Sequence, residues 1–527
     1  MSMALRNLPL FVCISVAVGL VSLSPSAEAA PGAISTGTGV HDATKNLPRT
    51  ARVGLSMAQL PPYRVYQRSS KTGGAAGRGV GTIVVPIALT ADAALVECRL
   101  RDADATGNPV IREWTAAAAN LSSATTSVSC SGVPADQKRY LVDIRCNGDD
   151  AAVALGTSPV MMGRVIVHWG QSQANQFITA AGKPPVLAPA SSSYLRHGKW
   201  APIPTNALGM NPFLHMEGRA NGVAVGLVAH AVDNSVIASW LPATGTSYPG
   251  LVAQLDLAGG FEAMDVHIGG SDLGVSTSPT AFVNAKRTVI RDLQDNHNPI
   301  WGRDTELVLT ATTVRRANSV NGASTVEAQQ AAERDLAVEL GGAYYEGWDI
   351  AMMANDSVHF DANGNPAYAY GLSRAFTALR TRDSLTAGPT ITSATMAGSA
   401  ITLAVALPPG GGALTVTGNP ASRFSAFPTG NTTSPLKIAS VSADKGRIVL
   451  QLATPPKGDI DIWLHRYPDP DPALGAAVIR DSYTADGAPY GRLVEPTVGA
   501  PVTADNPVPA IIASATTSAT ADVVARP

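Results

Sequence analysis

The stretch Val165-Ile166-Val167-His168-Trp169-Gly170-Gln171-Ser172-Gln173 decides the fold of this chain. Its first five residues are β-branched or aromatic apart from one histidine, which predicts a short buried strand. Gly170 follows at once and predicts a tight turn into a helix. Ser172 lies in that turn, where a hydroxyl projects over the end of the strand. In an open α/β sheet, ligand sites form at the carboxyl ends of the strands. The stretch therefore predicts a parallel sheet with a candidate nucleophile at its edge.

Further strands and helices of the same kind follow along the chain. Short apolar runs predict strands at 223–229, 263–268 and 306–310, and longer patterns predict helices at 326–340 and 366–379. Small and polar residues come directly after the strands. This alternation predicts an α/β domain with helices on both faces of the sheet.

The sequence on either side of this domain has a different pattern. Alternating runs at 81–87 and 140–145, and again at 401–407 and 447–452, are separated by turn residues and predict small β-sandwich-like modules. The predicted order is a linker at 30–60, an N-terminal β-sandwich module at 61–162, the three-layer α/β/α domain at 163–385, a C-terminal β module at 388–490 and a loose tail at 491–527.

The first 29 residues have the pattern of a secretory signal peptide. Arg6 precedes an apolar run at 8–23, and Ala27-Glu28-Ala29 forms a small-residue cleavage site. A membrane anchor is the alternative, but the run is shorter than the ~20 residues that span a bilayer. We expect cleavage after Ala29, no stable membrane span, and a secreted or periplasmic mature protein.

Composition and charge exclude some classes of partner. The 38 Lys and Arg residues nearly balance the 40 Asp and Glu residues in the 527-residue chain, so no basic surface for nucleic acid is expected. After removal of the signal, Cys98, Cys130 and Cys146 remain, without the spacing of a zinc site. Export permits at most one intramolecular disulfide among them, and the sequence does not select the pair. The sequence does not predict the oligomeric state.

Asp356 and His359 complete a candidate catalytic set with Ser172. Ester hydrolysis near neutral pH requires an activated nucleophile, so a histidine accepts the serine proton and a carboxylate orients the imidazole. Asp356 and His359 lie three residues apart in one late loop. Taken singly, Ser172 is also consistent with a helix-capping serine and His359 with a surface histidine. This chemistry requires no metal and no cofactor.

Four segments resemble the sequence blocks of SGNH-type carbohydrate esterases, in particular the sialate O-acetylesterase-like branch. In chain order they are Gly170-Gln171-Ser172-Gln173, the second block at 225–240, Gly269-Gly270-Ser271-Asp272 and Asp356-Ser357-Val358-His359. The resemblance covers residues 163–385. It implies an SGNH-like catalytic domain acting on an acylated carbohydrate or polysaccharide. In this resemblance Ser172 is the nucleophile, His359 the general base and Asp356 its orienting partner.

The resemblance also implies an oxyanion or substrate-binding role for Asn234, Gly269 and Ser271. Here the chain departs from the family pattern. Asp233-Asn234-Ser235 stands where the branch has Gly-Gly-Thr, and Ile268-Gly269-Gly270 where it has Gln-Gly-Glu. Asn tolerates the left-handed backbone conformation best among non-glycine residues, so Asn234 is expected to preserve the turn. The alternative function is a non-catalytic carbohydrate-binding or exopolysaccharide-assembly protein on the same fold.

Overall fold

The computed structural model describes residues 53–74, 77–275, 277–312, 323–345, 359–362, 364–381, 389–407, 412–417, 420–429, 431 and 434–464, together with short strands at 478–481, 484–485, 488–489 and 511–515. The predicted signal peptide, the first part of the linker and Asp356 lie outside these residues. No helix in the described ranges is long and apolar enough to cross a membrane.

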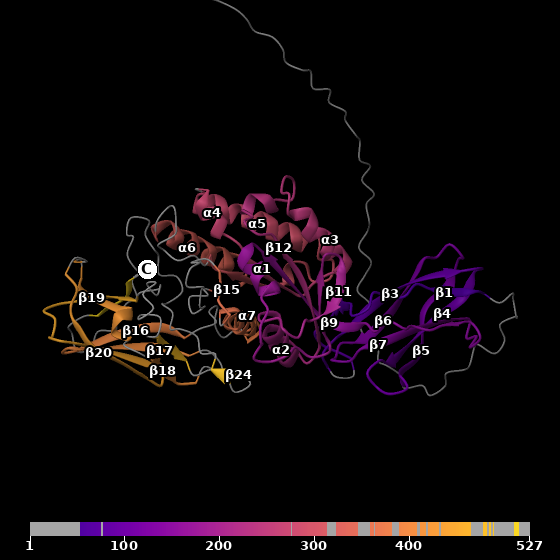
Figure 1. Ribbon diagram of the computed structural model, residues 1–527, viewed down its shortest axis with the longest axis horizontal. Coiled ribbons are helices and arrows are strands. Elements are labelled where there is room, and N and C mark those ends of the chain that lie inside the picture. Colours follow the sequence, from indigo (N-terminus) through magenta and orange to yellow (C-terminus); the bar gives the residue numbers. More distant parts are fainter. Residues whose placement is uncertain are drawn as a thin grey trace, which may run out of the picture. The chain divides into compact units, whose positions relative to one another are not determined.

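A large sheet forms the centre of the α/β domain (Figure 1). Its strands follow the order β11-β10-β12-β9-β13-β14-β15, and β2 pairs with β9 outside this path. The β10–β11 pair is antiparallel, whereas the other pairs in this sheet are parallel. The strands are β2 (Val65–Gln67), β9 (Met161–Gly170), β10 (Ser192–Arg196), β11 (Lys199–Pro202), β12 (Ala224–Ala231), β13 (Ala263–His267), β14 (Glu306–Thr310) and β15 (Ala343–Tyr345).

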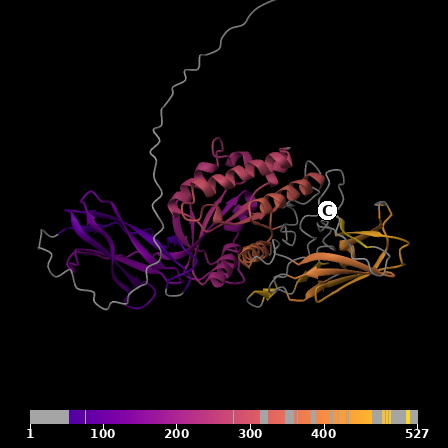
Figure 2. The ribbon, with the colours of Figure 1, turned by 180° about the vertical axis from the view of Figure 1, so that it is seen from behind.

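Helices pack on both faces of this sheet, as Figures 1 and 2 show. Successive residues of β9 point to opposite faces: Val165 and Val167 join one apolar core, and Ile166 joins the other. The first core includes α3 (Tyr248–Ala258), α5 (Pro279–Asn296) and α6 (Ala323–Glu339), and the second includes α1 (Ser172–Thr179), α2 (Met210–Asn221) and α7 (Gly364–Thr381). Shorter helices are η2 (Ile237–Trp240), α4 (Gly270–Gly274) and η3 (Gly302–Asp304). The predicted α/β domain with a parallel sheet is confirmed.

The flanking segments are built from antiparallel strands. Before the domain, the sheets β1-β3-β6 and β5-β4-β7-β8 share one apolar core. Their strands are β1 (Leu55–Met57), β3 (Val80–Leu89), β4 (Ala93–Asp102), β5 (Val110–Leu121), β6 (Ser127–Pro134), β7 (Tyr140–Cys146) and β8 (Val153–Ala154).

After the domain, the described sheets are β16-β17-β21-β20, β19-β22-β26, β18-β23 and β24-β25. Their elements are β16 (Thr390–Ala397), β17 (Ala400–Ala406), β18 (Leu414–Thr417), η5 (Pro420–Arg423), β19 (Phe424–Pro428), β20 (Ile438–Asp444), β21 (Arg447–Leu452), β22 (Ile460–Leu464), β23 (Val478–Asp481), β24 (Thr484–Ala485), β25 (Ala488–Pro489) and β26 (Ile511–Ala515). The description of the two flanking segments as separate sandwich modules stays a prediction.

The three cysteines all lie in the core of the N-terminal β segment. Cys98, Cys130 and Cys146 are free thiols, and each is buried. The disulfide that export permits is therefore not formed in the structure. Arg112 donates a hydrogen bond to the Cys98 sulfur across 3.3 Å.

A buried charge network fixes the amino-terminal end of the sheet. Arg164 in β9 is fully buried and donates to Glu262 and Glu306 at 2.9 and 2.7 Å, while its Nε lies 3.4 Å from Glu217. Arg68 forms a second contact with Glu262 at 2.7 Å. Burial alone raises the pKa of Glu306, but the charge and hydrogen bond of Arg164 outweigh it and lower that pKa to about 2. Arg164 thus compensates carboxylates that have little access to water.

We predict that Arg164→Met strongly destabilises the protein. The remaining cations Arg68, Lys71 and Arg380 are more exposed than Arg164, so its loss leaves the buried carboxylates undercompensated, and breaking a buried pair typically costs about 3–5 kcal/mol. Urea unfolding of the purified full chain measures the loss. The control is Arg287→Met, which removes the exposed ion pair with Glu339 and is expected to cost less than about 1 kcal/mol. Equal stability of Arg164→Met and the wild type would contradict the role given to the network.

Candidate active site

The ends of three central strands lie side by side and bring three of the sequence blocks to one edge of the sheet. In the observed register, Gly170 at the end of β9 pairs with Ala231 of β12 and with His267 of β13. The segments that begin at residues 171, 232 and 268 therefore leave the sheet at the same edge. This alignment gathers Ser172, Asn234 and Ser271 there, as the parallel arrangement predicts.

Gly170 permits the close approach from which Ser172 emerges. A Cβ atom on Gly170 would lie 1.9 Å from the backbone oxygen of His267, so a larger residue would separate β9 from β13. Gln171 then donates its backbone N–H to that same oxygen at 3.1 Å. Ser172 is the first residue of α1 and is half-buried. The N–H groups of the first helical turn and the positive end of the helix dipole therefore lie beside its hydroxyl.

The buried side chain of Gln171 connects the first block to the third. Its Oε1 accepts the backbone N–H groups of Gly269 and Ser271 at 3.1 and 3.2 Å, and its Nε2 donates to Gln173 at 2.7 Å. These contacts engage the backbone donors of two residues that the sequence assigns to the oxyanion site. A direct contribution of Ser271 to substrate binding would therefore come from its hydroxyl.

Asn234 adopts the left-handed conformation that the sequence predicts, with a φ of 57°. Its turn is exposed, and the side chain of the neighbouring Asp233 ties it to α1. Asn175 of α1 donates to the Asp233 carboxylate at 3.0 Å, and Arg196 donates to the Asn175 side-chain oxygen at 2.9 Å. The second block is thus linked to α1 and, through Asn175, to the guanidinium of Arg196.

Gln176 ties the chain next to His359 to the helix that begins with Ser172. Its side-chain Oε1 accepts the backbone N–H of Phe360 at 2.7 Å, and its Nε2 donates to the Phe360 backbone oxygen. Ser172 and Gln176 are four residues apart on α1 and so lie on the same face of that helix. His359, the residue before Phe360, is therefore brought to the helix that bears Ser172.

Another histidine–aspartate pair, His168 and Asp265, lies near Ser172, and its histidine is already engaged. His168 is buried, its Nδ1 contacts Asp265 at 2.7 Å and its Nε2 contacts the backbone oxygen of Ala174 at 3.2 Å. Both ring nitrogens thus face acceptors within the protein. Burial lowers the pKa of His267 to about 3, which makes it a poor general base. The base role of His359 stays a prediction from its sequence motif. In the described part of the chain, no group of three or more His, Cys, Asp or Glu side chains is arranged to hold a metal ion.

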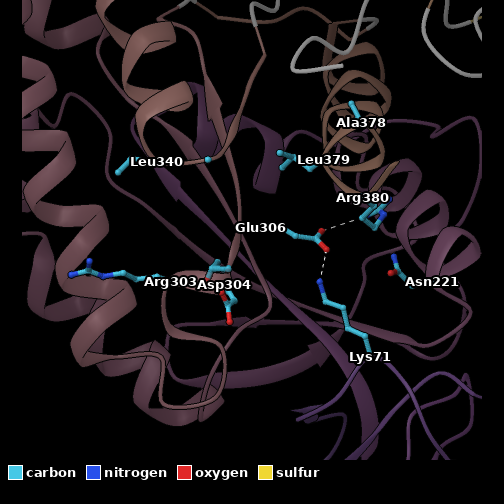
Figure 3. A pocket seen from close by; sticks show the side chains of 11 residues that line it. Lys71, Asn221, Arg303, Asp304, Glu306, Leu340, Ala378, Leu379 and Arg380 are labelled. Carbon is cyan, nitrogen blue, oxygen red and sulfur yellow. Dashed lines mark hydrogen bonds and ion pairs between the residues drawn. The ribbon is translucent and has the colours of Figure 1, made fainter. Parts of the chain in front are cut away.

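The cavity in Figure 3 lies at the other end of the strands. It has a volume of about 870 Å³, and Lys71, Glu306 and Arg380 are among its lining residues. Glu306 is the first residue of β14, whereas Ser172 follows the end of β9, and these strands run in the same direction. None of the described candidate site residues lines this cavity. Its charged side chains extend the network around Arg164.

The comparisons with known proteins concern the fold. No protein-family model matches the chain, and no curated protein matches its sequence at a significant level. A carbohydrate acetylesterase from Xanthomonas citri has a similar structure, with a TM-score of 0.50 and 14% identity, over 82% of this chain and 97% of that one.

Two further solved structures overlap less well. A protein from Arabidopsis thaliana aligns over 41% of this chain and 98% of its own at 14% identity, with a TM-score of 0.33. A carbohydrate esterase family 2 enzyme with a carbohydrate-binding domain, from Myceliophthora fergusii, aligns over 59% and 98% at 14% identity, with a TM-score of 0.28. These scores are too low to carry an argument. The predicted resemblance to SGNH-type hydrolases is confirmed as a resemblance of fold.

Sequence reasoning missed three residues that organise the site. They are Gln171, Gln176 and Asp272, whose side chains bind backbone groups of other segments. The signal for Gln171 was a polar residue placed directly between a buried strand and a helix. Asp272 is the last residue of the third block, but the resemblance assigned it no role. Gln176 had no comparable signal, because any residue type supplies the backbone groups that it binds.

We predict that Gln176→Ala slows the reaction of Ser172 with a fluorophosphonate probe. Loss of both bonds to Phe360 frees the chain next to His359, and misplacement of a catalytic group by about 1 Å costs on the order of a hundredfold in rate. Labelling followed by peptide mapping gives the rate. A matched control is Asn298→Ala, because the Asn298 amide makes the same two bonds to the Phe261 backbone elsewhere in the domain. If the probe labels Ser172 at the wild-type rate in both variants, Gln176 does not position the base.

Proposed function

We propose that the chain is an exported serine esterase that removes acetyl or other small acyl groups from a carbohydrate or polysaccharide. The observation that carries the proposal is the pair of hydrogen bonds between Gln176 and Phe360, since it links the His359 segment to the helix of Ser172. The likeness in fold to a carbohydrate acetylesterase supports the substrate class. Asp356 keeps the orienting role that the sequence motif gives it.

The proposed reaction proceeds in two steps. His359 accepts the hydroxyl proton as Ser172 Oγ bonds to the acyl carbon, and the sugar oxygen leaves with that proton. Water then loses a proton to His359, attacks the acyl-enzyme, and releases the carboxylic acid as Ser172 recovers its proton. The backbone N–H groups of Ser172 and of the Asp233-Asn234 turn are the proposed donors to the oxyanion.

A non-catalytic carbohydrate-binding protein is the second candidate. One observation favours it: the backbone donors of Gly269 and Ser271 are engaged by Gln171. Loss of one oxyanion donor typically lowers turnover by about a hundred- to a thousandfold. The two functions differ in whether Ser172 reacts, and not in whether the protein binds sugar.

We predict that Ser172→Ala and His359→Ala each lower cleavage of an acetylated polysaccharide by about 10⁴-fold or more while the fold is kept. Released acetate measures activity, and activity is expected to fall on acidification because a protonated imidazole cannot accept the serine proton. Ser278→Ala, which removes the N-cap of α5, is the control serine variant. Wild-type turnover in Ser172→Ala protein would refute the nucleophile. Sugar binding without any turnover or labelling of the wild type would support the binding protein.

We also predict that the double variant Asp233→Gly with Asn234→Gly keeps or raises activity on a small acetyl ester. Glycine adopts the left-handed conformation of Asn234 without strain, so the backbone N–H groups of the turn are preserved. Initial rates on a soluble acetyl ester measure the effect. A large loss would mean that the two side chains act directly, and that the backbone account of the oxyanion site is wrong.

A further inference from the structure

Asp272 is a buried carboxylate at the candidate site that the proposed reaction does not use. It lies in α4, next to Ser271, and its side chain is inaccessible to solvent. Both of its carboxylate oxygens accept the backbone N–H of Ile237, at 3.0 and 3.1 Å. Ile237 begins η2, directly after the turn that contains Asn234. The carboxylate therefore joins the third sequence block to the end of the second.

The turn between residues 232 and 237 is held at both ends. At its start, Val232 donates its backbone N–H to the backbone oxygen of Gly170 at 3.0 Å, and Asp233 accepts the bond from Asn175. At its end, Ile237 donates its backbone N–H to Asp272 of the third block. Asn234 lies between these anchors and is itself exposed. The position of its backbone relative to Ser172 therefore depends on both anchors.

Charged groups on two further helices face Asp272. Lys286 of α5 donates to Glu333 of α6 at 2.7 Å, and both side chains are fully buried. Burial raises the pKa of Asp272 to about 6, opposed by the Ile237 N–H and by Lys286, and Glu333 adds to the rise. Asp272 is thus ionised at neutral pH and takes up a proton as the pH falls through about 6. A bond to an ionised acceptor is roughly twice as strong as one to a neutral acceptor, so protonation weakens the hold on Ile237.

We infer that Asp272 is a positioning residue, whose ionised carboxylate holds the Asn234 turn in register with Ser172. The inference rests on the proposed function, because it assigns the turn an effect on catalysis. It also predicts a pH dependence of the reaction: acidification through about pH 6 protonates Asp272 and slows catalysis by weakening this anchor.

The test compares Asp272→Asn with the wild type across the acid limb of the pH profile. Asn keeps the size of the side chain but cannot carry the charge. We expect a loss of about tenfold or more in kcat near pH 7.5 with little change in KM. As the pH falls through about 6, the ratio of wild-type kcat to variant kcat is expected to shrink toward 1, because the wild type then loses the charge that the variant lacks at every pH. A variant with wild-type kcat and an unchanged acid limb would overturn the inference.

The melting temperature of Asp272→Asn shows whether Asp272 positions the Asn234 turn or stabilises the fold as a whole. The pKa of Asp272 is higher in the folded protein than the ordinary value of an unfolded chain, so the ionised form destabilises the fold above about pH 6. Asp272→Asn is therefore expected to melt at the same or a higher temperature than the wild type at pH 8, while it turns over more slowly. A parallel fall in melting temperature and in activity would assign Asp272 to the fold alone. Asp102→Asn, which alters another carboxylate that accepts a backbone N–H, is the control.

Hydrogen exchange distinguishes failure of the inference from failure of the proposed function. After correction for intrinsic rates, a peptide that contains Ile237 is expected to exchange faster in the wild type below pH 6 and at every pH in Asp272→Asn. This pattern, in a protein without esterase activity, would keep the anchor and reject the esterase. Exchange that is independent of Asp272, in an active esterase, would reject the anchor and keep the function.

Discussion

The amide of Gln171 is the contact on which the geometry of the candidate site depends. It is buried, and it binds backbone N–H groups of Gly269 and Ser271 while it donates to Gln173. A buried amide left without partners costs free energy, so the first and third blocks are stable only when they lie together. Ser172 follows Gln171 directly and takes its position from this arrangement. The second block and the His359 segment are then attached to the same helix through Asn175 and Gln176.

The sequence predicted the parts of the structure that have a local pattern. The strand before Ser172, the turn at Gly170 and the left-handed Asn234 follow from residue types and their spacing. The hydrogen bond between Gln176 and Phe360 joins residues 184 positions apart and involves the backbone of Phe360, so no residue pattern in the sequence indicates it. Arg164 did have a signal, a lone cation within an apolar strand, but its acidic partners come from distant segments. The role of Asp356 stays a prediction from its motif.

The two ends of the sheet differ in how their polar groups are compensated. At the amino-terminal end, Arg164 lies among carboxylates, which lowers the pKa of Glu306 to about 2. At the carboxyl end, burial raises the pKa of Asp272 to about 6 and lowers that of His267 to about 3, so both shifts favour the neutral form. The ionised form is thus stabilised at Glu306 and disfavoured at Asp272 and His267. A fall in pH from neutral therefore changes the protonation of Asp272, beside the candidate site, before it changes that of Glu306 in the charge network.

Strand β2 comes from the segment before the α/β domain, yet it pairs with the central strand β9. Arg68 and Lys71, which follow it, supply cations to Glu262 and Glu306. A fragment that begins at residue 163 would lack both the strand and these two cations, and would leave acidic side chains facing one another. A cut at the boundary between the two segments, or an exchange of the N-terminal segment, is therefore expected to destabilise the α/β domain. A chimaera that transfers the α/β domain to another protein would have to include residues 65–71, which complete its sheet and its charge network.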